Sequence, residues 1–192
     1  MPWRVIEEGV VPSLPLGRVK AALRIHHDAD DSMLRHFIQV ARQTIEQFTQ
    51  KVLGDVRLEI TLDRWEPSKH PWSGLTQDKS APTTWITLPV GPLHALETIS
   101  VRRGAGEWQD LSPHRFIVED CRLGVCGEMH GLIQDQHTLR IVGRGGINPL
   151  PPIIDGVWMS LVRLLYDSDT PEVRLVRGAL APLNFLRTRR LM

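Results

Sequence analysis

The densest group of side chains that could bind a metal ion lies in the stretch LRIHHDADDSML, residues 23–34. Two adjacent histidines and three carboxylates stand close together there: His26, His27, Asp28, Asp30 and Asp31. Metal ligands on a helix usually lie three or four positions apart, so that both face one ion, whereas adjacent histidines point in different directions. A metal-dependent hydrolase or nuclease that uses the two histidines with Asp28 and Asp30 is therefore only an alternative interpretation.

The same carboxylates have a structural explanation. Asp30 or Asp31 stands directly before a long apolar repeat, where a side-chain oxygen can accept a hydrogen bond from the N-terminus of a helix. The neighbouring carboxylates complement the positive end of the helix dipole. We therefore predict that this stretch starts a helix, with Asp30 or Asp31 as the N-cap acceptor, and that no metal is bound there.

A second group of candidate ligands combines both cysteines of the chain with two histidines: Cys121, Cys126, His130 and His137. The spacing Cys-x4-Cys-x3-His-x6-His only loosely resembles that of structural zinc sites. We interpret the cysteines as small, partly buried side chains near a hairpin, and the histidines as residues of an exposed loop. A zinc-stabilised binding module is kept as a further alternative.

Motifs for nucleotide binding and nucleophilic catalysis are missing from the sequence. The run Gly143-Arg144-Gly145-Gly146 is not followed by the Lys-Ser or Lys-Thr of a phosphate-binding P-loop, so we expect a flexible exit from a strand. The sequence contains no Gly-x-Ser-x-Gly nucleophile elbow. Tryptophans are scattered rather than interleaved with basic residues, which favours core and interface packing over nucleic-acid stacking. We expect no catalytic residue, no cofactor and no enzymatic activity.

The last residues of the chain form a basic tail. Arg187, Arg189 and Arg190 follow a predicted helix C-terminus, where the helix dipole favours cations. The segment ends in Leu191 and Met192, and a short basic peptide of this kind could also dock on a partner or line a passage for DNA. Both interpretations stay open.

Helical periodicity marks the first quarter of the chain. A short helix is expected over 16–25, after Pro12 and Pro15. A second helix follows, in which apolar residues recur at i, i+3, i+4 and i+7: Leu34, Phe37, Ile38, Ala41, Ile45, Phe48 and Val52. Gly54 stands where a helix C-cap is expected.

Helical patterns return near the other end. Pro151 and Pro152 suit a first helical turn, where a missing N–H is no loss. The residues up to Leu165 are apolar over most of the helix circumference, which predicts a buried helix at the centre of the fold. A last helical segment is expected over 173–186.

The middle of the chain has the two-residue period of β-strands. Val56, Leu58, Ile60 and Leu62 alternate with polar residues, which predicts a half-buried strand. Further strands are expected over 84–88, 96–103, 108–111, 115–119 and 138–142, and a long polar loop over 66–83. Frequent turn residues between the runs favour antiparallel hairpins.

These elements predict an α+β fold of a single domain, residues 1–192. Residues 15–54 and 150–190 would form a helical bundle, and residues 55–147 an inserted antiparallel β region. The formal net charge of the 192 residues is +1, which provides no overall field toward DNA or a membrane. No signal peptide or membrane span is apparent, so a cytoplasmic protein is expected.

Four segments, in order along the chain, resemble bacteriophage head-tail connector (adaptor) proteins. The first is VKAALRIHHDADDSMLRHFIQVARQTIEQFTQKVL, similar to the N-terminal helices of that family. The second, TWITLPVGPLHALETISV, resembles its strand, Leu-Pro-x-Gly-Pro turn and following strand. The third and fourth, LPPIIDGVWMSLVRLLYDSD and GALAPLNFLRTRRL, resemble its buried helix and its closing segment.

The resemblance implies a non-enzymatic structural adaptor of a tailed phage, prophage or gene transfer agent. Such subunits form a ring, dodecameric in the particle, between portal and tail, and serve head-tail joining, neck assembly and DNA passage. The implied partners are the portal protein, neighbouring copies, a tail or head-closure protein and double-stranded DNA in the channel, with no membrane. The subunit would be made in the bacterial cytoplasm and then reside in the particle neck. Residues expected to contact the portal or the ring are Arg187, Arg189, Arg190 and Leu191.

Overall fold

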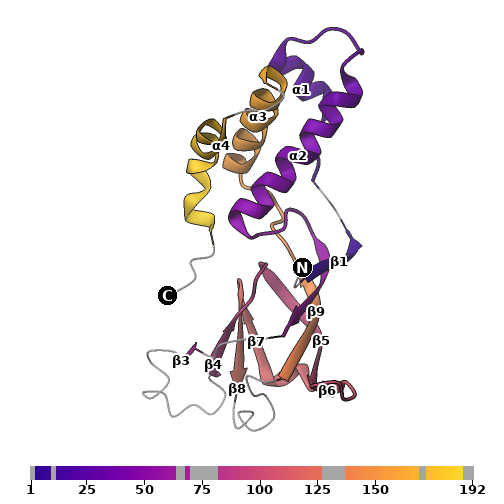
Figure 1. The fold of residues 1–192 in the computed structure, drawn as a ribbon, viewed down its shortest axis with the longest axis vertical. Coiled ribbons are helices and arrows are strands. Elements are labelled where there is room, and N and C mark those ends of the chain that lie inside the picture. The colour runs from indigo at the N-terminus through magenta and orange to yellow at the C-terminus, as the bar shows by residue number, and fades with distance from the viewer. Residues whose placement is uncertain are drawn as a thin grey trace. The chain divides into compact units, whose positions relative to one another are not determined.

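The computed structural model describes residues 3–9, 12–63, 68–69, 82–126, 137–168 and 172–187. In these ranges the chain forms α-helices and antiparallel β-sheets, which confirms the predicted α+β class (Figure 1). The residues group into two compact units. The helical unit comprises Val11–Leu53 and Asn148–Arg189, and the β unit comprises mainly Met1–Val10 and Gly54–Ile147.

The first helix, α1 (Leu16–Leu23), is the short helix that the sequence predicts. Pro15 precedes it with a backbone φ of −62°, a value at which proline starts a helix without strain. Val19 is fully buried. The helix ends two residues before the predicted position because Arg24 adopts the left-handed conformation, with φ 59°.

The second helix, α2 (Asp31–Thr49), has the predicted apolar stripe. Leu34, Ile38, Ala41 and Ile45 are buried along one face. The prediction of Gly54 as its C-cap is wrong, because the helix ends at Gln50, which takes a left-handed φ of 57°.

Side chains of α2 explain how the chain continues after this early end. The Glu46 carboxylate accepts hydrogen bonds from Arg42 Nε and from the Leu53 N–H, both at 3.0 Å. Arg42 also donates to the Leu53 carbonyl at 3.0 Å. These contacts satisfy backbone groups that a longer helix would have paired internally. Gly54, with φ 106°, instead begins the β unit, where its N–H donates to the Ile147 carbonyl at 2.9 Å.

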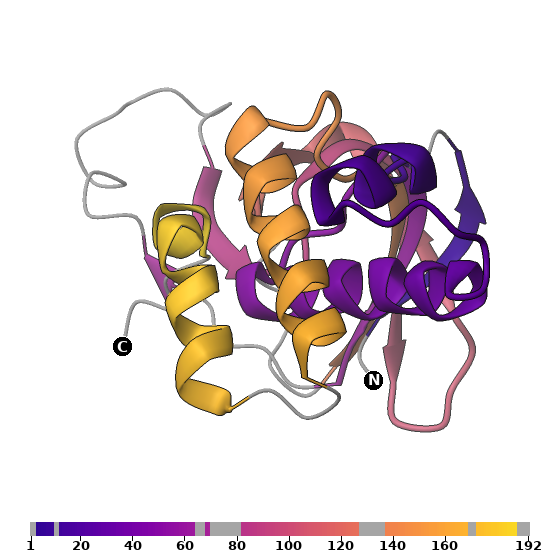
Figure 2. The same ribbon diagram turned by 90° about the horizontal axis from the view of Figure 1, so that it is seen from above.

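The third helix, α3 (Pro152–Asp167), is the centre of the helical unit. Ile154, Val157, Trp158, Leu161 and Val162 are buried, which confirms the predicted buried helix. The helix contacts α1, α2 and the C-terminal helical segment, and Figure 2 shows it lying between them. The Trp158 side chain is 1% exposed, and its Nε1–H donates to the Ile38 carbonyl of α2 at 2.9 Å.

The C-terminal helical segment consists of α4 (Val173–Leu180) and a 3₁₀ turn, η3 (Ala181–Leu186). Leu180 and Leu183 are buried against the rest of the unit. The predicted helix over 173–186 is confirmed, with a tightening of its last part at Pro182, which cannot donate a backbone hydrogen bond.

The β unit contains a five-stranded sheet in the order β1-β2-β9-β5-β6. Its strands are β1 (Trp3–Glu8), β2 (Val56–Leu62), β5 (Leu93–Arg103), β6 (Gln109–Leu111) and β9 (His137–Gly145). All neighbouring strands are antiparallel. Strand β1 was not predicted, because a bulge between Val5 and Glu7 interrupts the two-residue period.

A second sheet has the order β3-β4-β8-β7. Its strands are β3 (Ser68–Lys69), β4 (Pro82–Thr87), β7 (Phe116–Glu119) and β8 (Arg122–Cys126), and a 3₁₀ turn, η1 (Pro113–Arg115), precedes β7. The short strands β3 and β8 were not predicted, since β3 has only two residues and Gly124 stands in the middle of β8, where glycine does not favour a strand.

The five-stranded sheet has one apolar and one polar face. Fully buried residues alternate along three of its strands: Leu58, Ile60, Ile99, Leu139 and Ile141. Charged residues occupy the alternate positions: Arg57, Glu59, Arg102, Arg140 and Arg144. The half-buried strand predicted over 56–62 is thereby confirmed.

Gly143, Arg144 and Gly145 belong to β9, so this part of the glycine run is not the flexible exit that the sequence suggested, and only Gly146 follows the strand. A Cβ atom at Gly143 would collide with the Ala95 carbonyl oxygen, and one at Gly145 with that of Pro92. The register between β5 and β9 shifts at two bulges in this part of the pairing. Glycine therefore allows the two backbones to approach closely here.

Truncation of Trp158 tests the central role of α3. Trp158→Ala is expected to lower the free energy of unfolding by about 3–5 kcal/mol, because it removes a large buried side chain. Urea unfolding followed by circular dichroism measures the change. The matched control is Phe185→Ala, whose side chain is 69% exposed and whose loss should cost no more than about 0.5 kcal/mol. Equal effects of the two substitutions would contradict the assignment of α3 as the core helix.

Candidate functional site

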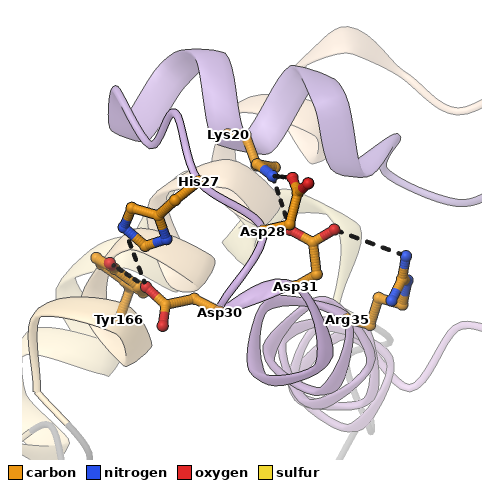
Figure 3. Close-up of polar contacts among 7 residues, drawn as sticks. All are labelled: Lys20, His27, Asp28, Asp30, Asp31, Arg35 and Tyr166. Carbon is orange, nitrogen blue, oxygen red and sulfur yellow. Dashed lines mark hydrogen bonds and ion pairs between the residues drawn. The ribbon is translucent and has the colours of Figure 1, made fainter.

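The junction between α1 and α2 brings Lys20 between two carboxylates (Figure 3). Lys20 Nζ lies 2.5 Å from Asp28 Oδ1 and 2.8 Å from Asp31 Oδ1. The hydrogen bond that Lys20 donates to Asp28, followed by the one that it donates to Asp31, raises the pKa of the Lys20 ammonium above its usual 10.5. The hydrogen bond from Lys20 lowers the pKa of Asp28 below 3.8. The two charges thus stabilise one another in the folded chain.

Asp30 stands at the N-cap position of α2, but its side chain makes no capping hydrogen bond. The prediction that the Asp30 side chain caps the N-terminus of this helix is therefore wrong. The Asp30 carboxylate instead accepts a hydrogen bond of 2.9 Å from the Tyr166 hydroxyl of α3. This bond raises the pKa of Tyr166 above its usual 10.0, since the carboxylate favours the protonated hydroxyl. His27 Nε2 lies 3.9 Å from Asp30 Oδ2, which is too far for a hydrogen bond.

The carboxylates of the junction are thus engaged with cations and a hydroxyl. Asp31 also lies 3.9 Å from Arg35, one turn further along α2. Within the ranges that the structure describes, no three side chains of His, Cys, Asp or Glu gather as a group that could hold a metal ion. The junction of α1 and α2 therefore acts as a tie between α1, α2 and α3.

The cysteine and histidine group is spread along β8 and its neighbours. Cys121 is buried in the turn before β8, whereas Cys126 is the last residue of that strand. The five residues of β8, from Arg122 to Cys126, extend over about 13 Å at the rise of a β-strand. Two zinc-bound sulfurs lie within about 5 Å of each other, so this strand keeps the two cysteines too far apart for one ion. His137 begins β9, and His130 lies outside the described residues.

The predicted partner-binding tail begins at a residue that has an intramolecular contact. The Arg187 guanidinium lies 4.8 Å from the ring centroid of Phe48, near the C-terminal end of α2. This cation–π contact fixes the point at which the chain leaves η3. Arg189, Arg190 and Leu191 lie outside the described residues.

The C-terminal helical segment also carries an exposed surface that sequence periodicity did not predict. Val173 is 66% exposed, Leu175 52% and Phe185 69%, more than any other large apolar side chain in the described ranges. Arg174 and Arg177 are exposed on the same helix, and the described chain provides neither with an ion pair. Exposed aromatic, aliphatic and arginine side chains together are typical of protein–protein interfaces. We call these five residues the α4 surface.

None of the described helices is both long enough and apolar enough to cross a membrane.

Comparison with protein families gives one match. The family model described as phage gp6-like head-tail connector protein matches residues 14–104, just under half of the 192 residues. Residues 14–104 are therefore similar to phage head-tail connector proteins. The match confirms the resemblance that the sequence motifs indicated, and it extends from α1 through the hairpin strand β5. Comparison with curated proteins gives no match.

Similarity to solved structures extends beyond residues 14–104 to nearly the whole chain. A chain in the virion of a native gene transfer agent (GTA) particle aligns with a TM-score of 0.70 and 19% identity, over 100% of this chain and 98% of that one. A chain in the neck of an empty GTA particle, computed with C6 symmetry, aligns with a TM-score of 0.67, 19% identity and the same coverage. A chain in the neck of a native GTA particle, computed with C12 symmetry, aligns with a TM-score of 0.66 and 18% identity over 98% and 97%. These chains share the complete fold.

Substitution of Asp28 tests the tie at the α1–α2 junction. Its carboxylate has a lowered pKa in the folded chain, so its stabilisation is present above pH 3.8 and is lost as the pH falls through the folded pKa. The raised pKa of Lys20 means that its stabilisation is present below pH 10.5 and is lost as the pH rises through the folded pKa. Asp28→Asn should therefore reduce the loss of stability on both the acid and the alkaline side.

Urea midpoints at neutral, acidic and alkaline pH measure this change. The effect should be small, because the Asp28 side chain is 90% exposed and solvent screens the pair. Glu7→Gln is the matched control, since Glu7 is an exposed carboxylate for which the described chain provides no ion pair. An Asp28→Asn profile that follows the wild-type profile at both extremes of pH would refute the tie.

Proposed function

We propose that this chain is a structural adaptor of a phage-like particle, in which copies form a ring between portal and tail. The observation that carries the proposal is the alignment of the whole chain with chains of GTA particles, combined with the connector match of residues 14–104. At 18–19% sequence identity, the alignment with the GTA chains supports a shared fold. The family match of residues 14–104 supports a role in head-tail joining. Together they support a neck protein rather than an unrelated protein of similar fold.

A ring places specific demands on the subunit surface. The aligned neck structures were computed with C6 and C12 symmetry, and we infer a similar cyclic arrangement for this chain. Cyclic rings larger than dimers use heterologous interfaces, in which one patch of a subunit meets a different patch of its neighbour. We propose that the α4 surface is one such patch. Three of its residues are apolar side chains that the described chain leaves more than half exposed.

The basic tail is the second proposed contact. Arg187 is held against Phe48, so the residues after it start from a defined position on the helical unit. We infer that Arg189, Arg190 and Leu191 dock on the portal, together with the exposed edge of Arg187. Repeated around a ring, these cations would also concentrate positive charge near the path of double-stranded DNA, although one chain carries a net charge of only +1.

The proposed role is structural and needs neither enzymatic activity nor a cofactor. The subunit would be made in the host cytoplasm, join the portal after DNA packaging and remain in the particle neck with a tail or head-closure protein. The junction carboxylates of the hydrolase alternative are engaged by Lys20 and Tyr166, and strand β8 separates the cysteines of the zinc alternative. No observation in the described chain favours either alternative.

A charged residue at position 185 tests the α4 surface. Phe185→Asp should prevent ring formation without lowering the unfolding midpoint, because the side chain is 69% exposed in the single chain. Electron microscopy and native mass spectrometry of the purified chain, alone and mixed with its portal, measure assembly. Ile117→Asp is the matched control, an equally radical change at a 42% exposed residue of β7. Assembly of Phe185→Asp at the wild-type level would exclude the α4 surface.

Deletion of residues 188–192 tests the tail separately. The subunit should fold as before, because Arg187 keeps its contact with Phe48, but particles should accumulate as DNA-filled heads without tails. Particle morphology and transducing or infectious titre are the measurements. A chain that keeps its length but carries Arg189→Ser and Arg190→Ser separates the effect of charge from that of chain length. Normal titres from the deletion would argue against a docking tail.

A further inference from the structure

The polar face of the five-stranded sheet carries three groups of arginine side chains, and in two of them each guanidinium lies beside a carboxylate. Arg4 of β1 pairs with Glu59 of β2 at 2.9 Å. Arg57 of β2 and Arg144 of β9 share the carboxylate of Glu97, at 2.7 and 3.6 Å. Each of these guanidinium groups therefore has an acidic partner within the sheet.

The third group lies further along the same face. Arg140 is directly opposite Ser100 in the β5–β9 pairing, and Arg102 is two residues beyond Ser100, so all three point to one side of the sheet. The guanidinium carbons of Arg102 and Arg140 lie 4.6 and 4.5 Å from the ring centroid of Trp108. Two cations thus stack on one indole.

The two arginines of this third group, Arg102 and Arg140, have no ion-pair partner in the described chain. The nearby Asp110 carboxylate accepts a hydrogen bond from Ser100 Oγ at 2.7 Å. Arg102 Nε is buried and has no hydrogen-bond partner. A buried donor that is left unpaired costs free energy, and two cations on one ring repel each other. An added anion would relieve both costs.

Stacking also prepares the two side chains for recognition. A guanidinium that stacks through its planar face keeps its N–H edge available, and this edge matches the two oxygens of a carboxylate. The contact with Trp108 limits the rotamers of both arginines, so less conformational entropy is lost when a ligand binds. Tryptophan and arginine are also the residues that most often dominate binding energy at protein interfaces.

We propose that Arg102, Trp108 and Arg140 form a binding site for the carboxylates of an acidic segment of a protein partner. The distribution of charge on the sheet favours this ligand over DNA. A nucleic-acid backbone needs a continuous basic track, whereas the other arginines of this face are already paired with Glu59 and Glu97. The site lies wholly within the β unit and does not depend on ring formation by the chain.

Calorimetric titration of the full-length chain tests the site without any particle protein. The probe is a synthetic hexapeptide of alternating glutamate and serine, and a 20-base-pair DNA duplex is titrated in parallel. Arg102→Gln with Arg140→Gln should weaken peptide binding about tenfold or more. Because the loss of Arg102 could disturb the sheet, Arg140→Gln alone is measured as well, with thermal unfolding of each variant as the check on folding.

The matched control removes two arginine charges from the same face of the sheet, at residues that already form ion pairs with Glu59 and Glu97. Arg4→Gln with Arg144→Gln should leave the peptide affinity within about twofold of the wild type. Lysine at positions 102 and 140 keeps the charge but loses the planar edge, so it should not restore binding. Absence of peptide binding by the wild type, equal losses in the control, restoration by lysine, or tighter binding of the duplex that depends on the same arginines would each overturn the proposal.

Discussion

The helical unit depends on one buried polar contact, the hydrogen bond from the Trp158 indole to the Ile38 carbonyl at 2.9 Å. A buried indole N–H needs an acceptor, and a backbone carbonyl of α2 provides it at this position. The bond joins residues 120 positions apart in the sequence. Together with the contact of Tyr166 and Asp30 it sets α3 antiparallel to α2, so the two ends of the chain form one compact unit.

This constraint explains why the middle of the chain can be a separate unit. If residues 38 and 158 must meet, the chain that leaves after Leu53 has to return by Asn148. The first and last residues of the β unit lie side by side, because the Gly54 N–H donates to the Ile147 carbonyl and Val56 pairs with Gly145. Entry and exit strands are therefore neighbours. Each unit can then present its own surface to partners, the α4 surface on one and the Arg102–Trp108–Arg140 site on the other.

The junction of α1 and α2 shows how far residue types alone lead toward a site. Histidines and carboxylates within six positions are compatible with metal binding or with the start of a helix, and their spacing favours the helix. The local sequence pattern did not show which residues pair with Asp28 and Asp30. Lys20 belongs to the preceding helix and Tyr166 to a helix 136 residues away from Asp30, so neither could be assigned before the helices were packed.

The sequence by itself determined the α+β class, the buried helix around Trp158, the apolar stripe of α2 and the alternation of β2. These features repeat at a fixed local period, which the burial of one face imposes on neighbouring residues. Only the tertiary structure decided that α2 ends at Gln50, that the glycines of β9 lie within a strand and that Arg187 stacks on Phe48. It also decided which arginines of the sheet have partners. Such contacts depend on strand register and helix packing, and neither can be predicted from the pattern of residues that are adjacent in the sequence.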